Sequence, residues 1–123
     1  MKFLGTGSAL PKKVVSNDDL AQVMDTSDEW IRSRTGIGMR HIAVEETTTS
    51  MAVEAAEEAL ADAKISGCEI DLIIAGTISP DYIFPSLACE VQAAIGAKSA
   101  TAFDLSAGCS GFLFALAPAD AYF

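Results

Sequence analysis

Short apolar runs alternate with longer segments of helical periodicity in the second half of the chain, and this alternation constrains the fold more than any other feature. The run 72–75 (Leu-Ile-Ile-Ala) follows an aspartate and is typical of a strand that is buried on both faces. A second strand is expected over 100–105. Strands that alternate with helices indicate a mostly parallel sheet, so the pattern predicts an α/β domain.

The helical segments between these runs have recognisable ends. Apolar residues at helical spacing predict a helix that begins near Thr48 and ends at Ser66. Another helix is expected from Pro85 to about Ile95, because proline is favoured at the first turn of a helix and a glycine follows the segment. These boundaries place one helix before the first strand and one between the two strands.

The N-terminal third carries two capping signals. Ser16 or Asn17 can cap a short helix that is expected over 18–24. The tetrad 26–29 (Thr-Ser-Asp-Glu) has the form of a capping box, with its threonine as the cap. It predicts a helix that runs to about Thr35, where a glycine stops it.

The segment before these helices is expected to be a loop, from Gly5 to Pro11, after a short first strand. Its Gly-Thr-Gly spacing superficially fits a dinucleotide-binding loop. Such a loop must open a helix, and no helical pattern follows here. We therefore expect no nucleotide site in this loop.

Composition excludes several classes of protein. The length of 123 residues suits one domain, and a chain that is 50% hydrophobic and 20% charged is not disordered. Eight basic against 17 acidic residues give a net charge of −9, which argues against nucleic-acid binding. The longest uncharged run, 105–119, is too short to cross a membrane. Three cysteines without a C-x-x-C pair, and a single histidine, favour a reducing cytoplasmic location and predict no metal site.

Cys109 is the strongest candidate for chemistry. It follows the second predicted strand, lies in a turn of small residues over 107–111, and precedes a very apolar helix. Free amide groups at the start of a helix favour an anion, so they would favour a thiolate and could hold the oxyanion of a bound acyl group. The arrangement resembles the nucleophile elbow of acyl-transfer enzymes. A small buried residue without chemistry is the alternative on the turn alone.

The other candidates lack this setting. Cys68 lies in a loop beside an acidic residue, and Cys89 lies in the middle of a predicted helix, where packing is the expected role. His41 belongs to a basic turn, and nothing in the sequence links it to Cys109 as a general base.

Trp30 and Arg34 lie four residues apart on one predicted helix and therefore on one face of it. An indole beside a guanidinium could hold a flat, anionic nucleotide ligand by stacking and by charge. A cation–π pair within the helix, without any ligand, is the alternative. The stretch 30–41 contains three arginines and no acidic residue, so an anionic group would dock there if it docks anywhere.

Four blocks of the sequence then carry a family resemblance. They read Asp-Thr-Ser-Asp-Glu-Trp-Ile-x-x-Arg-Thr-Gly-Ile over 25–37, Arg-His-Ile-Ala over 40–43, Phe-Pro-Ser over 84–86 and Ala-Phe-Asp-Leu-x-Ala-x-Cys-x-Gly-Phe over 102–112. In this order they resemble β-ketoacyl-acyl-carrier-protein synthase III, a member of the thiolase superfamily, from about residue 4 to residue 122.

The resemblance implies a decarboxylating Claisen condensation that initiates fatty-acid synthesis. In that family a cysteine takes an acyl group, usually acetyl, from acyl-coenzyme A, and the acyl group then condenses with malonyl-acyl carrier protein; no further cofactor takes part. Cys109 matches the acylated nucleophile. Trp30 and Arg34 match the pair that holds the adenine end of coenzyme A, and Thr26 matches a neighbouring contact. Phe84 matches a residue that reaches the partner subunit's acyl pocket in a homodimer.

The resemblance also implies what this chain is expected to lack. The family fold consists of two duplicated α/β halves with five layers (αβαβα), and residues 1–123 match most of the first half as a single domain. The family's catalytic histidine and asparagine lie beyond the matched part. We therefore expect the isolated chain to be inactive in condensation, and an inactive remnant or fragment that keeps only coenzyme A and dimer surfaces is the alternative function. The helix after Cys109 should expose a large apolar face and promote aggregation, and Pro118 should kink or end that helix unless the tail departs from the family's.

Overall fold

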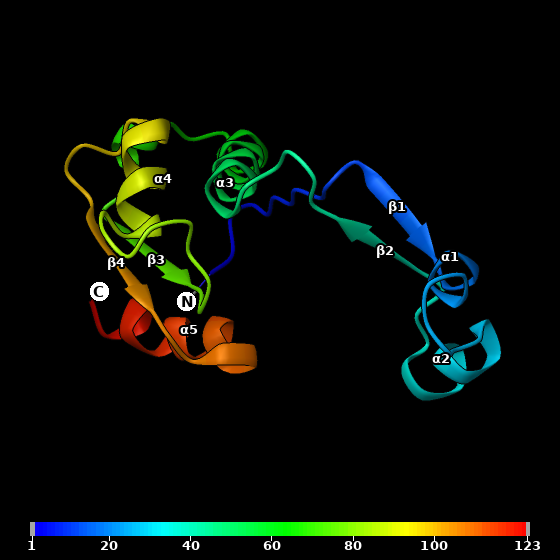
Figure 1. Cartoon of the computed structure of the whole chain (residues 1–123). Helices are drawn as coiled ribbons and strands as arrows, with labels where there is room; N and C mark the ends of the chain where they lie inside the picture. The colour runs from blue at the N-terminus through cyan, green and yellow to red at the C-terminus, as the bar shows by residue number, and fades with distance from the viewer. Residues whose placement is uncertain (1, 123) are drawn as a thin grey trace. The chain divides into compact units, whose positions relative to one another are not determined.

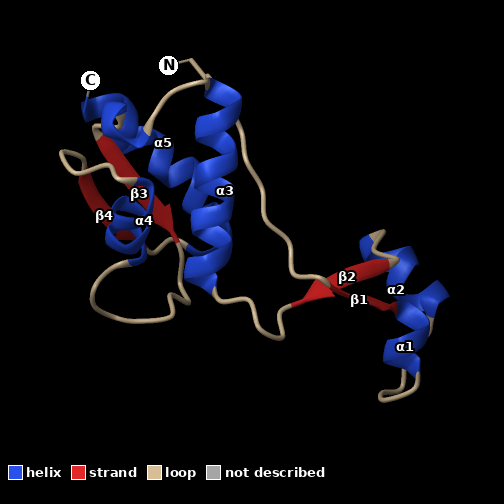
Figure 2. Ribbon diagram, turned by 90° about the horizontal axis from the view of Figure 1, so that it is seen from above, coloured by secondary structure: helices blue, strands red, loops and turns tan. Residues whose placement is uncertain are grey.

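The structure, a computed structural model, describes residues 2–122 and divides the chain into two compact units (Figures 1 and 2). The smaller unit spans 10–46. The larger unit combines the N-terminal segment up to Ala9 with the chain from Thr47 onward. Each unit is built differently and is described separately below.

The larger unit contains a two-stranded parallel sheet and three helices. β3 pairs with β4 so that Leu72 lies opposite Thr101 and Gly76 lies opposite Leu105. Its elements are α3 (Thr48–Ala63), β3 (Leu72–Gly76), α4 (Leu87–Ile95), β4 (Thr101–Leu105) and α5 (Gly111–Tyr122), with 3₁₀ turns at Gly67–Glu69 and Gly108–Ser110. The predicted helices, strands and parallel pairing are thus confirmed to within a few residues.

Helices pack on both faces of this sheet. Ile73 shares a cavity with Val91 and Ile95 of α4, whereas Leu72 and Ile74 share another with α5. Figure 1 accordingly shows β3 and β4 between α4 and α5. The buried hydrophobic residues belong to α4 and to the loop that follows it: Leu87, Ala88, Val91, Ala97 and Ala100. Helix α4 is therefore the centre of the apolar core.

The two strands are less buried than the sequence predicts. All residues of β3 from Leu72 to Ala75 are half-buried, and none is fully buried. The outward surface of α5 is strongly apolar, because Phe112, Leu113 and Phe114 are 67%, 68% and 60% exposed. The expected apolar face after Cys109 is confirmed, and its effect on aggregation stays a prediction. Helix α5 also continues past Pro118 as far as Tyr122, so the proline does not end the helix.

The N-terminal segment departs from expectation. Residues 2–11 form no strand, so the short first strand predicted there is wrong. The segment lies against α3 instead, with the Thr6 amide donating to Asp62 (2.9 Å) and the Ser8 amide donating to Glu58. A Cβ atom on Gly7 would lie 2.0 Å from the Ala55 carbonyl oxygen, so only glycine permits this close approach.

The smaller unit pairs an antiparallel ribbon with two helices. β1 (Lys13–Ser16) pairs with β2 (Met39–Ile42), and α1 (Asn17–Ala21) and α2 (Asp28–Thr35) lie between them in the chain. Each strand of this ribbon is only four residues long, too short to leave an alternating pattern in the sequence, so the ribbon was not predicted. Within 10–46 no hydrophobic side chain is buried, and the centre of the unit is the side chain of Asn17, which is 1% exposed.

Both predicted helices of the smaller unit exist, with one corrected cap. Ser16 caps α1 as expected, and Gly36 ends α2 with a φ of 74°. The cap of α2 is Ser27 rather than Thr26, because the Ser27 hydroxyl accepts a hydrogen bond from the Trp30 amide at 3.1 Å. The predicted capping box was therefore placed one residue too early.

Within 2–122, the structure contains no helix that is both long and apolar enough to cross a membrane.

Candidate functional site

Cys109 lies at the tip of a turn that joins the end of β4 to α5. The cysteine turn (residues 107–111) contains the 3₁₀ turn Gly108–Ser110, in which the Ser110 amide donates to the Ala107 carbonyl at 3.1 Å. Gly108 has a φ of 53°, a conformation that glycine adopts without cost. The thiol of Cys109 belongs to an exposed residue. In this chain Cys109 is therefore not the buried packing residue that the alternative predicts.

A close backbone contact holds the turn against β3. The α-carbon of Gly76, the last residue of β3, is 3.4 Å from where a Cβ atom on Gly111 would lie. One residue further along the chain, the Thr77 amide donates to the Leu105 carbonyl at 3.2 Å. The start of α5 is thus fixed directly beside the ends of both strands. The sequence predicts the small residues of this turn but not the contact that Gly111 makes.

Asp104 links β4 to α4, and sequence reasoning did not single it out. Its two carboxylate oxygens accept hydrogen bonds from the amides of Leu87 (2.9 Å) and Ala88 (2.8 Å), which are the first two residues of α4. A carboxylate at the start of a helix is stabilised by the free amides there. Asp104 therefore holds α4 against the strand that leads to the cysteine turn. The only feature of the sequence that could have identified Asp104 is its place in the 102–112 block, which carries the family resemblance.

The other two cysteines occupy different settings. Cys89 lies within α4, is half-buried, and places its sulfur 3.9 Å from the Ala102 carbonyl, which fits the predicted packing role. Cys68 is exposed in a 3₁₀ turn, with its sulfur 3.0 Å from the Ser66 hydroxyl. Cys89 is the third residue of α4, in its first turn and not in the middle of the helix as predicted, but unlike Cys109 it is not exposed.

Trp30 and Arg34 form the pair that their spacing predicts. The guanidinium carbon of Arg34 lies 4.5 Å from the centre of the indole ring, and the tryptophan is 53% exposed. A hollow of about 260 Å³ lies beside both side chains, and Ser27, Glu29 and Ser33 complete its lining. An adjacent hollow is lined by Thr26 together with Asp25, Ser27 and Trp30. The structure thus brings Thr26, Trp30 and Arg34 to one surface of the smaller unit, whereas Cys109 belongs to the larger unit.

The remaining cations of this stretch are already engaged. The Arg32 guanidinium binds Asp28 at 2.8 Å, and Arg40 donates to the Val15 carbonyl at 3.0 Å and to the side chain of Asn17. The Arg34 guanidinium instead lies over the indole of Trp30, which is the cation–π pair within the helix that the alternative to a ligand site predicts. His41 bonds through its ring to the Pro11 carbonyl and belongs to the smaller unit.

Phe84 lies in a loop between β3 and α4 and is 89% exposed, next to Ile83 at 99%. The peptide bond between Phe84 and Pro85 is cis. Because the Phe84 side chain is almost fully exposed, its aromatic surface is available for contact with another molecule.

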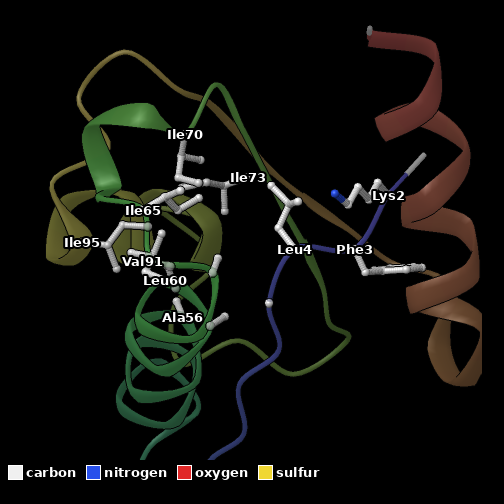
Figure 3. Close-up of a pocket in the computed structure, with 13 residues that line it drawn as sticks. Lys2, Phe3, Leu4, Ala56, Leu60, Ile65, Ile70, Ile73, Val91 and Ile95 are labelled. Carbon is white, nitrogen blue, oxygen red and sulfur yellow. The ribbon is translucent and has the colours of Figure 1, made fainter.

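Two further features of the chain bear on ligand binding. In the described part of the chain no group of three histidine, cysteine, aspartate or glutamate residues could hold a metal ion. The cavity shown in Figure 3, about 390 Å³, lies among α3, α4, β3 and the N-terminal segment. Its lining is aliphatic and aromatic apart from Lys2, so it contains no set of polar groups that could orient a substrate.

Comparison with known proteins gives one consistent result. No family model matches the chain. The chain is 55% identical over 122 residues to β-ketoacyl-[acyl-carrier-protein] synthase III of Xylella fastidiosa and 56% identical over 121 residues to that of Aquifex aeolicus. Each match covers 98% of this chain, but only 38% and 39% of the relatives' length. The resemblance stated from the sequence blocks is thereby confirmed for a segment of that protein.

Solved structures agree. The fold matches 3-oxoacyl-[acyl-carrier-protein] synthase III of Aquifex aeolicus with a TM-score of 0.95, over 98% of this chain and 39% of that one, at 56% identity. It matches the priming β-ketosynthase of the R1128 polyketide pathway with a TM-score of 0.91 at 40% identity, over 96% of this chain and 36% of that one. The predicted α/β, thiolase-like fold is confirmed as part of a thiolase-like half.

Proposed function

We propose that this chain supplies the acylated cysteine and part of the coenzyme A site of a β-ketoacyl-[acyl-carrier-protein] synthase III, the protein that it resembles over 98% of its own length. Its role is to transfer an acyl group, in the first instance acetyl, from coenzyme A to Cys109. That group then condenses with malonyl-acyl carrier protein to start fatty-acid synthesis in the cytoplasm. The observation that carries the proposal is an exposed cysteine at a strand–turn–helix junction within a sequence 55% identical to such synthases.

The first half-reaction follows from the position of Cys109. Its thiolate attacks the thioester carbonyl, the C–S bond to coenzyme A breaks, and coenzyme A leaves as a thiolate that takes up a proton. Amide groups at the start of α5 favour negative charge, both on the sulfur before attack and on the carbonyl oxygen in the tetrahedral intermediate. The small residues of the cysteine turn leave space for the acyl carbon to approach.

The second half-reaction forms the new carbon–carbon bond. Loss of carbon dioxide from the malonyl group leaves a carbanion, which attacks the acyl carbon on Cys109 and displaces the cysteine thiolate. No oxidation or reduction takes place, so the proposal requires no redox cofactor. The histidine and asparagine that the family resemblance assigns to this step are not matched by His41.

Coenzyme A itself is assigned to the smaller unit. The indole of Trp30 offers a stacking surface for an adenine ring, and Arg34, fixed against that indole at 4.5 Å, supplies a positive charge for a phosphate. Thr26 lines the neighbouring hollow and adds a hydroxyl. We further propose a homodimer, in which the exposed Phe84 enters the acyl pocket of a second subunit.

A labelling experiment tests the nucleophile. The 123-residue chain is incubated with acetyl-coenzyme A carrying a labelled acetyl group, and the modified residue is identified by mass spectrometry. We expect slow labelling of Cys109, which Cys109→Ala abolishes and which the matched controls Cys68→Ala and Cys89→Ala leave intact. Label that survives in Cys109→Ala would remove the assignment of the nucleophile.

A chimera tests the whole reaction. These residues replace the corresponding segment of the Aquifex aeolicus synthase, which is 56% identical to them, and condensation with malonyl-acyl carrier protein is measured. We expect an active chimera that loses more than about 10³-fold in rate with Cys109→Ala. An inactive but folded chimera would favour the alternative, a remnant without catalysis. Acetoacetyl-carrier protein made by the isolated chain would contradict the expectation that the chain alone cannot condense.

A further inference from the structure

Asn17 is an unusual centre for a folded unit. Within 2–122 it is the only buried side chain that is polar, and it is 1% exposed while no hydrophobic side chain of 10–46 is buried. Polar side chains are buried only when their hydrogen bonds are satisfied, since an unsatisfied one costs about 1–3 kcal/mol. In this unit the hydrogen bonds of Asn17 stand where other units have a hydrophobic core. The role of Asn17 therefore depends on which elements those hydrogen bonds hold in place.

The amide group of Asn17 holds both ends of α2. Its two N–H groups donate to the Asp28 carboxylate at 2.8 Å and to the Ile37 carbonyl at 2.7 Å. Asp28 is the first residue of α2, and Ile37 follows the glycine that ends the helix. On the other side, the amide oxygen of Asn17 accepts a hydrogen bond from Arg40 of β2. One side chain thus joins the start of the helix, its end and the ribbon.

Only an asparagine fits this set of partners at this length. It needs two donors on one atom and an acceptor on the other, which a primary amide provides. Aspartate has the same shape but would present acceptors to the Asp28 carboxylate and to the Ile37 carbonyl. The bond also affects Asp28: its hydrogen bond from Asn17, more than its pairing with Arg32, lowers the pKa of this carboxyl.

Trp30 and Arg34 lie on the helix that is held in this way. Their side chains are exposed, and they contact each other across one turn of the helix. The two bonds from Asn17 tie both ends of α2 to the rest of the unit, and α1 also packs against α2, whereas the Arg32–Asp28 pair lies within α2 itself. If α2 rotated about its own axis, the side chains of Trp30 and Arg34 would both move away from a bound nucleotide.

We propose that Asn17 is a positioning residue for coenzyme A: by binding both ends of α2 it holds the Trp30–Arg34 pair in the geometry that receives the nucleotide. This inference rests on the proposed function of that pair. Asn17 itself is only 1% exposed, so its side chain is not open to a nucleotide that binds at the surface. Its contribution is therefore to the affinity for coenzyme A and not to the chemistry at Cys109.

The test is a double-mutant cycle in the chimera with the Aquifex aeolicus synthase. Asn17→Asp keeps the shape and the acceptor for Arg40 but loses both donors to α2. We expect the KM for acetyl-coenzyme A to rise about tenfold, as for other supporting residues of a binding site, with kcat unchanged. In the Trp30→Ala/Arg34→Ala background the same substitution should have no further effect, because the pair it positions is gone. Ser16→Ala, which removes neighbouring hydrogen bonds that do not reach α2, is the matched control and should leave KM unchanged.

Each other outcome has a defined meaning. If Asn17→Asp raises KM equally in both backgrounds, or lowers kcat, the effect is a general loss of structure and the positioning role is wrong. If Asn17→Asp is silent while Trp30→Ala/Arg34→Ala raises KM, only the positioning role fails. If Trp30→Ala/Arg34→Ala is itself silent, the proposed coenzyme A site fails as well.

A second pair of variants covers the case in which Asn17→Asp does not fold. Asp28→Ala removes the partner at the start of α2 and should raise the KM for acetyl-coenzyme A. Asp28→Asn retains an oxygen that can accept the hydrogen bond from Asn17 at 2.8 Å and should restore most of the affinity. Equal KM values for the two Asp28 variants would overturn the proposal.

Discussion

The two units of this chain keep their shapes by different means. In the larger unit a parallel strand pair and α4 enclose a small apolar core, and the cysteine turn follows the end of β4. In the smaller unit no hydrophobic side chain is buried, and the hydrogen bonds of Asn17 hold the helix with Trp30 and Arg34. Apolar packing tolerates small changes of shape, whereas a hydrogen-bonded centre depends on the identity of one side chain. Substitutions in the larger unit should therefore change its stability mainly through the volume of the side chain. Substitutions in the smaller unit should do so mainly through lost hydrogen bonds.

The largest effect on stability should come from the core of the larger unit. Leu87 is 5% exposed at the start of α4, and Leu87→Ala leaves a cavity that should lower the free energy of unfolding by about 3 kcal/mol. Urea unfolding followed by circular dichroism measures the change. Val23 in the smaller unit is the matched control, because it is 78% exposed and Val23→Ala should change the free energy by less than about 0.5 kcal/mol. Equal losses for the two variants would contradict the contrast between the units.

A somewhat smaller effect is expected from the polar link within the larger unit. Asp104→Ala removes the carboxylate that accepts from the first two amides of α4 and should lower the free energy of unfolding by about 2 kcal/mol. Hydrogen exchange should accelerate most at the amides of Leu87 and Ala88. Asp104→Asn keeps one accepting oxygen and should recover part of the loss. No change in exchange at these two amides would show that α4 is held by packing alone.

The same contrast explains what the sequence predicts. Periodicity and capping residues identify α3, α4 and both parallel strands, because apolar faces and helix ends leave a local signature. They also identify Cys109 by its turn and the Trp30–Arg34 pair by its spacing, which the structure places at 4.5 Å. For the larger unit, local pattern and tertiary packing favour the same structure.

The features that were not predicted depend on hydrogen bonds to residues far away in the sequence. Asn17 looks like a helix cap, and only its bonds to Asp28 and Ile37, 11 and 20 residues away, show that it is the centre of a unit. The N-terminal segment has the hydrophobicity of a strand but lies along α3, with two amides bound to carboxylates of that helix. Ser27 rather than Thr26 is the cap, since serine is preferred over threonine at this position and the Ser27 hydroxyl is the one that accepts from the Trp30 amide.

A pH titration should affect both units, since each has one carboxylate with a strongly lowered pKa. Hydrogen bonds, first from the Thr49 amide, lower the pKa of Asp81 from an ordinary 3.8 to about 2 at the start of α3. Bonds led by that of the Lys12 amide lower the pKa of Glu46 from 4.5 to about 2 in the smaller unit. The folded-state values lie below the unfolded ones, so the stabilisation is complete above about pH 5 and is lost as the pH falls through about 2.

The variants Asp81→Asn and Glu46→Gln separate the two contributions. Each should reduce the loss of stability between pH 5 and pH 2 in its own unit. Trp30 is the single tryptophan of the chain, so its fluorescence follows the smaller unit, and hydrogen exchange at Thr48 and Thr49 follows the start of α3. A tryptophan signal that responds to Asp81→Asn as strongly as to Glu46→Gln would mean that the two units unfold together.

The smallest effect on stability is expected at the residues with the largest proposed role in binding. Arg34→Lys keeps the charge but replaces the planar guanidinium that lies over Trp30. Because the pair is exposed, its loss should lower the free energy of unfolding by only about 0.5 kcal/mol. The KM for acetyl-coenzyme A in the chimera should nevertheless rise severalfold, since a lysine ammonium cannot stack against a nucleotide as a guanidinium does. A loss of stability comparable to that of Leu87→Ala would instead show that the Trp30–Arg34 pair stabilises the smaller unit. In that case Asn17 would not be the main residue that holds the unit together.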